Sequence, residues 1–373
     1  MIRYLLFSLF PCLFLNLGFA GQSADEIRMN QVCVLGSHNS YKQRIDPSLL
    51  DLMRQSIGND RVKGLEYSHI AVEKQLDRGL RALEIDVVYD PKGGLYAHPK
   101  GLDLEKENNL PTGPAYDPEG LMLKPGLKVL HIPDLDFRAN VYTFQQELAK
   151  LKAWSDAHPR HLPIVITMNA KDDGVKRPGY VQPLPFDQAA FDAWDAEIVQ
   201  GLGRGKLVTP DDVRGQHETL ESAVLAQDWP MLEKARGKFL FVLDETGKKM
   251  ETYTDGHPSL KGRVMFANET EGKPEAAFRI VNDAKQDWAY IQYLVRSGYM
   301  VRTRADAETV EARKNDYSRW KAALISGAQI VSTDYYNADP AFNSGYHVQF
   351  PENLPGLWNP LLLPTARPLP PIE

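Results

Sequence analysis

The sequence predicts a (β/α)8 barrel, the α/β fold also called a TIM barrel. Eight short apolar runs have the length of buried strands, and segments with apolar residues three or four positions apart lie between them. Strands that alternate with helices form parallel sheets, and eight of them close a barrel. The alternative is an open doubly wound sheet, but no G-x-G-x-x-G motif follows the first predicted strand.

The predicted elements follow one another along almost the whole chain. The strands cover residues 32–36, 82–88, 128–132, 163–168, 238–244, 263–267, 299–303 and 328–333. The helices cover residues 70–80, 141–154, 186–202, 287–298 and 308–327. Val72, Leu76 and Leu80 share one face of the first helix, and a glycine ends each of the last two. The Gly-, Pro- and Asn-rich stretch up to about residue 126 predicts a hairpin or an ordered loop.

The first twenty residues have the pattern of a secretory signal peptide. Arg3 precedes an apolar segment, and the small residue Ala20 ends it. We therefore expect cleavage after Ala20 and a secreted or periplasmic protein. A membrane anchor is the alternative, but Pro11 interrupts the apolar segment, and polar residues begin directly after Ala20. Residues 21–373 are then expected to form one barrel domain, with a Pro-rich extension from about residue 340 to 373 lying over its outside.

The bulk composition is that of a soluble globular protein. The chain has 373 residues, 43% of them hydrophobic and 25% charged, and a formal net charge of −6. This charge argues against nucleic acid as a partner and restricts contact with an anionic membrane to local patches. After removal of the signal peptide, Cys33 is the only cysteine, which excludes an intrachain disulfide. The sequence points to no protein partner, and we expect a monomer.

Polar residues gather at the ends of the predicted strands. In a barrel of this kind, functional side chains come from the carboxyl ends of the strands and the loops that follow them. The residues in such positions are His38, Asn39, Glu84, Asp86, His131, Asn169, Lys171, Arg302 and Arg304. The sequence therefore predicts that these side chains share one mouth of the barrel.

Glu84 and Asp86 predict a cation site. Side chains alternate between the two faces of a strand, so these carboxylates share one face while Leu83 and Ile85 share the other. If the leucine face packs on helices, both carboxylates point into the barrel, where they repel each other and are poorly solvated. Oxygen ligands without a thiolate favour Ca²⁺, with Mg²⁺ as the other possibility. The alternative is that Lys171 or an arginine neutralises the pair.

Two histidines are candidates for acid–base chemistry. His38 and His131 each end a predicted strand, and a pair of imidazoles around a carboxylate–metal centre suits a general base and a general acid. His98 competes with His131 but lies in the irregular stretch, so it ranks behind. No catalytic role is expected for His69, His158, His161, His217, His257 and His347.

Basic side chains complete the expected mouth. Lys171, Arg302 and Arg304 would add positive charge beside the metal and the histidines. A cation, two histidines and several basic groups are typical of a site for phosphate esters. The alternative for each arginine is an ordinary surface salt bridge.

Three motifs together resemble a known family. The segments GSHNSY, LEIDVVYD and KVLHIPDLDF, in this order, are similar to those of bacterial calcium-dependent phosphatidylinositol-specific phospholipase C, within the superfamily of PLC-like phosphodiesterases. The likeness extends from about residue 30 to 340. No single segment is specific, but the combination of His-Asn, Glu-x-Asp and a second strand-end histidine is.

The resemblance implies roles for the strand-end residues. It implies that His38 and His131 are the acid–base pair and that the metal ligands are Asn39, Glu84 and Asp86. Where the family usually has a further acidic ligand, this chain has Asn169, so Asp172 is an alternative ligand. Lys171 matches a phosphate-contacting position, and Arg302, Arg304 and Tyr335 would bind the polar head group.

The resemblance also implies an activity. A secreted, Ca²⁺-dependent phosphodiesterase would cleave phosphatidylinositol-type lipids at a membrane surface into diacylglycerol and an inositol (cyclic) phosphate. The closest rival is a glycerophosphodiester phosphodiesterase, which shares the barrel, the metal and two histidines. A rival from another class is a secreted binding protein whose barrel has lost catalysis, which the uncharged Asn169 keeps open.

Overall fold

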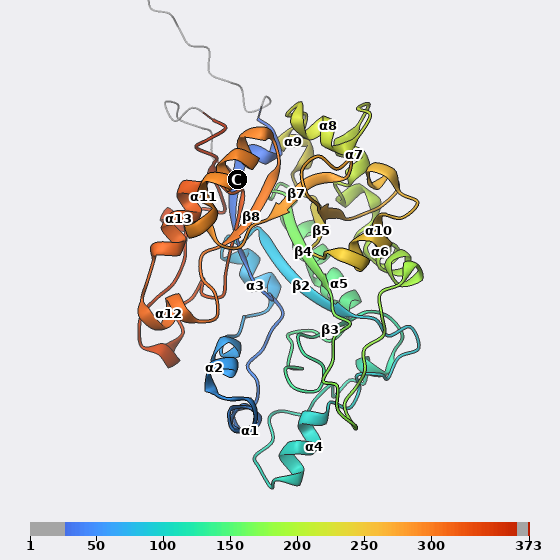
Figure 1. Cartoon of the computed structure of the whole chain (residues 1–373), viewed down its shortest axis with the longest axis vertical. Coiled ribbons are helices and arrows are strands. Elements are labelled where there is room, and N and C mark those ends of the chain that lie inside the picture. The colour runs from blue at the N-terminus through green and yellow to red at the C-terminus, as the bar shows by residue number, and fades with distance from the viewer. Residues whose placement is uncertain (1–26, 364–371) are drawn as a thin grey trace, which may run out of the picture.

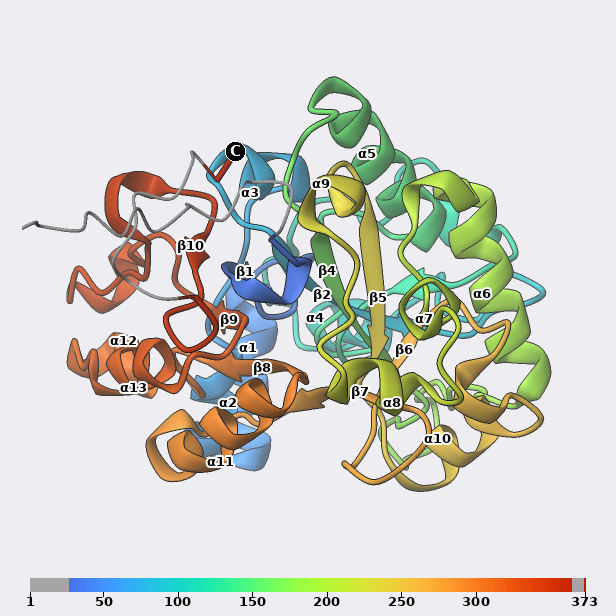
Figure 2. The ribbon, with the colours of Figure 1, turned by 90° about the horizontal axis from the view of Figure 1, so that it is seen from above.

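Eight parallel strands form a closed barrel. The computed structural model describes residues 27–363 and 372–373. The barrel strands are β1 (Val32–Ser37), β2 (Ala82–Val88), β4 (Ile164–Ala170), β5 (Phe239–Leu243), β6 (Phe266–Asn268), β7 (Ala276–Ile280), β8 (Met300–Arg304) and β9 (Ile330–Thr333). They pair in the order β1, β9, β8, β7, β6, β5, β4, β2, and β2 pairs with β1 again. The predicted (β/α)8 barrel is confirmed (Figures 1 and 2).

One predicted barrel strand is wrong. Residues 128–132 contribute only β3 (Lys128–Val129), which pairs antiparallel with the end of β2 and lies outside the barrel. The eighth barrel strand is instead β7, which the sequence analysis missed. Its sequence AAFRI contains two alanines and only one β-branched residue, Ile280, so its strand signal is weak. A second antiparallel strand, β10 (Leu357–Trp358), pairs with the start of β1.

Helices surround the barrel (Figure 2). They are α1 (Pro47–Ile57), α2 (Asn59–Val62), α3 (Val72–Asp77), α4 (Lys100–Glu107), α5 (Phe144–Ala157), α6 (Gln188–Leu202), α7 (Pro210–Arg214), α8 (Leu220–Leu225), α9 (Leu232–Ala235), α10 (Gly247–Thr254), α11 (Ala284–Ser297), α12 (Val310–Lys314) and α13 (Ser318–Ser326). The helix predicted at 308–327 is two helices, because Asn315 has a φ of 53° and ends α12.

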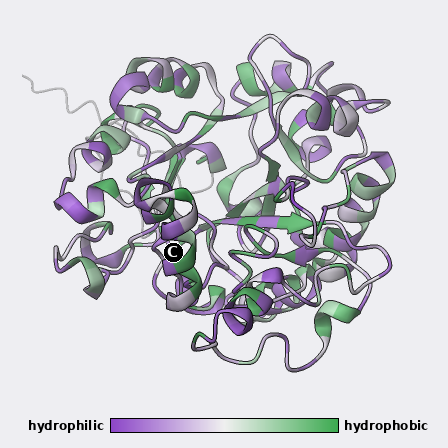
Figure 3. Ribbon diagram, turned by 60° about the horizontal axis from the view of Figure 1, so that its bottom comes forward, coloured by the Kyte–Doolittle hydropathy of each residue, from purple (hydrophilic) through white to green (hydrophobic). Residues whose placement is uncertain are grey.

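Side-chain caps define where the long helices begin. The Thr143 hydroxyl accepts a hydrogen bond from the Gln146 amide at 3.2 Å and starts α5. Asp187 accepts from the Ala190 amide at 2.9 Å and starts α6 in the same way. The apolar faces of these helices then pack on the sheet, and the helices show both hydrophobic and hydrophilic residues in Figure 3. None of the helices in the described residues is both long and apolar enough to span a membrane.

The end of β1 is built to bring polar residues into the barrel mouth. Gly36 pairs with Ala82 of β2, and a Cβ at Gly36 would lie 2.5 Å from the Ala82 carbonyl oxygen, so only glycine fits. Asn39 then adopts a left-handed φ of 48°. This turn returns Ser40 to β2, where its amide donates to the Glu84 carbonyl at 2.8 Å. His38 and Asn39 are thus fixed beside Glu84.

The segments that follow β1 and β2 extend this mouth. They contain α1 and α4, which lie at the lower end of the molecule in Figure 1. Part of the expected Pro-rich extension packs on the outside of the barrel, where Phe350 lies against Trp320. Glu373 forms an ion pair with Arg81. The predicted signal peptide, and residues 364–371 of the extension, lie outside the described residues.

Candidate active site

His38 is held by an aspartate that the sequence analysis did not single out. Its Nδ1 lies 2.9 Å from Oδ1 of Asp334, which follows β9, the neighbour of β1 in the barrel. Arg304 donates to the other carboxylate oxygen of Asp334 at 3.0 Å, and its guanidinium also lies 3.4 Å from the His38 ring. The ring is therefore fixed between the carboxylate of Asp334 and the guanidinium of Arg304. Its Nε2 is the nitrogen on the side of Glu84.

The surroundings of His38 favour its neutral form. Burial lowers the pKa of His38 well below 6.5, and the positive charge of Arg304 lowers it further, while Glu84 opposes the shift. A smaller contribution comes from His131, so the two candidate histidines lie within electrostatic reach of each other. At neutral pH, His38 is therefore an unprotonated imidazole that can accept a proton.

Glu84 points into the barrel, in agreement with the alternation expected for β2. Its carboxylate accepts a hydrogen bond from Arg302 on β8, a strand that does not pair with β2. Only side chains inside the barrel can meet across it in this way. The Asn169 amide lies 3.4 Å from the other carboxylate oxygen of Glu84, and Nε2 of His38 lies 3.6 Å from it.

Asp86 is an unusual buried carboxylate. It is fully buried, and neither of its oxygens accepts a hydrogen bond from the described residues. The Lys171 ammonium lies 3.1 Å from Oδ2, but that side chain is about one-third exposed at 32%. A buried anion without hydrogen bonds is costly unless a cation lies beside it. Lys171 and Arg302 thus neutralise the two acids in this structure, which was the alternative to a metal.

The donor set nevertheless fits a hard cation. Glu84 and Asp86 supply carboxylates, and Asp86 and Asn169 stand side by side in the register of β2 and β4. The Asn39 amide nitrogen donates to the Tyr67 hydroxyl at 2.7 Å, which leaves its oxygen as a further donor. Across residues 27–363 and 372–373, no three His, Cys, Asp or Glu side chains converge as a metal site. Two carboxylates with two amides are all-oxygen ligands of the kind that Ca²⁺ takes.

His131 has a different setting. It follows the two-residue strand β3, and its Nδ1 lies 2.7 Å from Oδ2 of Asp136. Asp136 is fully buried and lies 3.4 Å from the ammonium group of Lys42, which is also fully buried. The second histidine therefore has its own acidic partner, which the sequence analysis also missed.

Three residues considered in the sequence analysis lie elsewhere. Tyr335 is buried between Phe342 and Tyr346, so its side chain is turned away from the mouth and cannot bind a head group as expected. Asp172 pairs with Lys249 at 2.9 Å rather than with the carboxylates of β2. His98 is exposed and pairs with Asp103, which leaves His131 as the second histidine.

Two further side chains belong to the surroundings of the site. His69, to which no role was given, is buried and donates from Nε2 to the His38 carbonyl at 2.8 Å. Asp244, at the end of β5, accepts from Asn268 at 2.9 Å; burial raises its pKa, with Glu84 and Asp86 adding to the rise. Asp244 is the last residue of the predicted strand 238–244, and Asp334 directly follows the predicted strand 328–333, so the strand-end rule applied to every strand would have found both.

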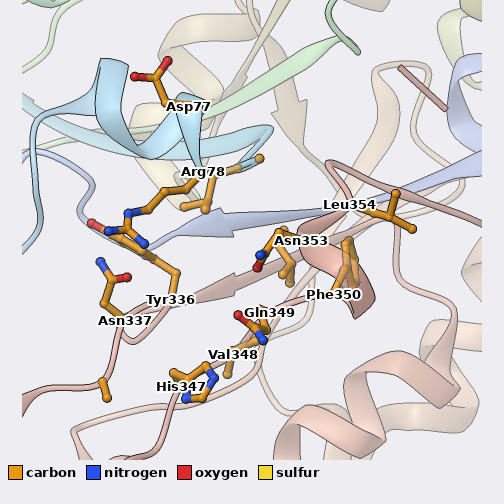
Figure 4. Close-up of a pocket in the computed structure, with 14 residues that line it drawn as sticks. Asp77, Arg78, Tyr336, Asn337, His347, Val348, Gln349, Phe350, Asn353 and Leu354 are labelled. Atoms are coloured by element: carbon orange, nitrogen blue, oxygen red, sulfur yellow. The ribbon is translucent and has the colours of Figure 1, made fainter. Parts of the chain in front are cut away.

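One cavity borders this region at Asp334, and a second lies beside the first. One of about 420 Å³ is lined by Asp334, His69 and Tyr336. Another of about 510 Å³ shares Tyr336 with it (Figure 4). In that view Arg78, Tyr336 and Asn337 lie at one end and Phe350, Asn353 and Leu354 at the other. Neither cavity includes Glu84, Asp86 or His131.

The chain is similar in fold to solved structures of bacterial phospholipases. The calcium-dependent phosphoinositol-specific phospholipase C from Pseudomonas sp. matches with a TM-score of 0.53 at 16% identity, over 90% of this chain and 96% of that one. Its myoinositol complex matches with a TM-score of 0.51 at 17% identity, over 83% and 91%. The Ca²⁺-dependent enzyme from Streptomyces antibioticus gives a TM-score of 0.51 at 18% identity, over 83% and 95%. At this identity the likeness shows the fold.

A comparison with the curated proteins finds no match. A family model does match: it is described as "Phosphoinositide phospholipase C, Ca2+-dependent", and it covers residues 27–360. That range includes the whole barrel and every side chain of the mouth described above. The chain therefore belongs to the Ca²⁺-dependent phosphoinositide phospholipase C family of phosphoric diester hydrolases.

Proposed function

We propose that this protein cleaves phosphatidylinositol-type lipids to diacylglycerol and an inositol (cyclic) phosphate, with His38 and His131 as its acid–base pair. One observation carries the proposal. A neutral, half-buried imidazole, held by Asp334, lies 3.6 Å from Glu84 in the mouth of a barrel with a second, independently held histidine. This arrangement suits proton removal at one point of a phosphodiester and proton donation at another.

His38 is proposed as the general base. Because Nδ1 is bonded to Asp334, Nε2 is the nitrogen that accepts the proton of the inositol 2-hydroxyl. The hydroxyl oxygen then attacks phosphorus, and the bond between phosphorus and the glycerol oxygen breaks. His131 donates a proton to that departing oxygen, which yields diacylglycerol and a cyclic phosphate. Water can open the ring afterwards, with the two histidines exchanging roles.

Asn39, Glu84, Asp86 and Asn169 are proposed as the residues that hold Ca²⁺. The bound ion would supply positive charge to the phosphate and make the 2-hydroxyl more acidic. Support comes from the all-oxygen donor set and from the two oxygens of Asp86 that accept no hydrogen bond. Arg302 and Lys171, which pair with Glu84 and Asp86, would remain beside these carboxylates when the ion binds.

Basic side chains are proposed to bind the phosphate. Arg304 is the best placed, because its guanidinium already lies beside the His38 ring at 3.4 Å. Lys171, which directly follows β4, and Arg302, on β8, belong to the same mouth. Their charges favour a phosphodiester over a neutral ester.

The decisive experiment uses vesicles that contain phosphatidylinositol, with calcium or with a chelator. With calcium, we expect release of water-soluble inositol phosphate and diacylglycerol. With the chelator, we expect most of this activity to be lost. Glycerol 3-phosphate from glycerophosphodiesters, without any inositol phosphate from the lipid, would identify the rival phosphodiesterase. Absence of any phosphodiester cleavage, together with no effect of calcium on the melting temperature, would favour a binding protein.

Secretion and a monomeric state are further parts of the proposal. Secretion rests on the amino-terminal sequence alone, since residues 1–26 lie outside the described residues. Mass spectrometry of the protein from the culture medium or periplasm should give a chain that begins at Gly21. Light scattering of the purified protein should give a mass close to that of one chain.

A further inference from the structure

The loop after His131 folds back onto the ring. Ile132 and Asp136 form a backbone bridge, in which the Asp136 amide donates to the Ile132 carbonyl at 2.9 Å. Asp134, at the tip of this loop, has a left-handed φ of 73°. The turn brings Asp136 Oδ2 within 2.7 Å of Nδ1 of a histidine only five residues earlier.

Asp136 is in turn held by Lys42. The two side chains are fully buried, and the ammonium lies 3.4 Å from the carboxylate. Lys42 also donates to the carbonyl of Leu65 at 2.9 Å and to that of Tyr67 at 3.1 Å, so it is fixed in place. A buried ion pair of this kind is seldom a source of stability, because the desolvation of both charges offsets their attraction.

The neighbouring Asp134 shows what a structural aspartate looks like in the same loop. It accepts from the backbone amide of Lys100 at 2.8 Å and from that of Val181 at 2.7 Å, and so ties three segments together. Asp136, by contrast, has only the His131 ring and the Lys42 ammonium as side-chain partners among the described residues. Its carboxylate is directed at the histidine and not at the backbone.

We propose that Asp136, held by Lys42, is the positioning residue for His131. The carboxylate keeps the proton of the neutral ring on Nδ1, so that Nε2 is the nitrogen that faces the glycerol oxygen. It also stabilises the positive charge that the ring carries before it gives up its proton. This inference rests on the proposed function, in which His131 protonates the leaving group.

The activity test compares Asp136→Asn with Asp134→Asn on phosphatidylinositol vesicles and on an inositol phosphodiester with a nitrophenol leaving group. Asp136→Asn should lower kcat on the lipid by about 100-fold or more with little change in KM, as expected when a general acid is misaligned. On the nitrophenyl substrate the loss should shrink to within about 10-fold, because nitrophenolate departs without a proton. Asp134→Asn should lower the melting temperature but affect both substrates alike.

A second measurement does not need activity. Nitrogen-15 NMR of the His131 ring in the full-length protein should show a protonated Nδ1 in the wild type and a changed tautomer distribution in Asp136→Asn and Lys42→Met. If the wild type cleaves neither substrate, the proposed function is wrong. The NMR measurement of the His131 tautomer would still show whether Asp136 positions that ring. If Asp136→Asn keeps kcat within about twofold, or loses equally on both substrates, the inference is overturned.

Discussion

The two histidines of the mouth are held in opposite ways. His38 ends a regular barrel strand, and its partner Asp334 comes from the other end of the chain, 296 residues away. His131 follows a two-residue strand outside the barrel, and its partner Asp136 is five residues away. The first environment depends on closure of the barrel, whereas the second is made by one loop.

The difference suits different chemistry. Arg304 and burial keep His38 neutral, which a general base requires. His131 is bonded to Asp136 and has no hydrogen bond to an arginine within the described residues, and so it is the better candidate for the proton donor. A single barrel mouth can thus give two imidazoles different charged neighbours, Arg304 and Asp334 for His38 and Asp136 for His131.

The strongest test of the comparison is to remove each ring. His38→Ala and His131→Ala should each lower the turnover of phosphatidylinositol by about 1,000-fold or more while the protein stays folded. A nitrophenyl leaving group should restore much of the activity of His131→Ala and little of that of His38→Ala. His98→Ala is the control, because His98 is exposed and bonded to Asp103. Equal recovery of the two variants would show that the roles are not divided.

A second test asks whether calcium binds at the carboxylates beside His38. Calcium at about 100 times its dissociation constant should stabilise the wild type by about 2.7 kcal/mol, seen as a higher melting temperature. Asp86→Asn should weaken calcium binding by more than about 100-fold, since loss of outer partners alone costs 10–100-fold. Asp172→Asn is the matched control, because its carboxylate pairs with Lys249. Normal calcium affinity in Asp86→Asn would remove Asp86 from the ligand set.

The stability of the His38 side should depend on pH. Burial lowers the pKa of His69 from 6.5 to about 4, so between these values the unfolded chain binds a proton that the folded one does not. The free energy of unfolding should therefore fall by up to ~3 kcal/mol as the pH drops from 6.5 to 4. Urea titrations over this range should show a shallower dependence for His69→Gln. An unchanged dependence would mean that other groups cause the acid sensitivity.

The smallest expected effect concerns the pH profile of activity. Arg304→Gln removes a positive charge that lowers the pKa of His38, and it frees Asp334 to attract a proton to the ring. The acidic limb of kcat/KM should therefore move to higher pH, in addition to a loss at every pH from the missing phosphate contact. The alkaline limb, which reports the acid, should stay in place. A shift of the acidic limb to lower pH would contradict the assigned base.

The strand-end rule found most of the mouth from the sequence. His38, Glu84, Asp86, Asn169, Arg302 and Arg304 all lie there, because parallel strands of a barrel present their carboxyl ends on one side. Their partners were harder to predict. Arg302 contacts Glu84 because both side chains point into the barrel from strands that are distant in the sequence. No local sequence pattern predicts such a pair.

The errors have physical reasons. Strand β7 was missed because its alanines give a weak apolar signal, and the apolar run 128–132 was mistaken for it in the count of eight. The head-group role of Tyr335 came from the family resemblance alone, and alternation argues against it, because Asp334 before it already occupies the inward position. Asp136 was inside a quoted motif, but only the turn at Asp134 shows that it folds back onto His131.

The junction between β1 and β2 has a consequence for how the molecule moves. β1 and β2 pair only through Gly36 and Ala82, with single backbone hydrogen bonds on either side, from Arg81 to Leu35 and from Ser40 to Glu84. A junction with so little main-chain pairing is where transient local unfolding costs least, so amide hydrogens there should exchange with solvent sooner than those of β4 and β5. His38 follows Gly36 by two residues. The positional stability of the proposed base therefore depends on how rarely β1 and β2 separate.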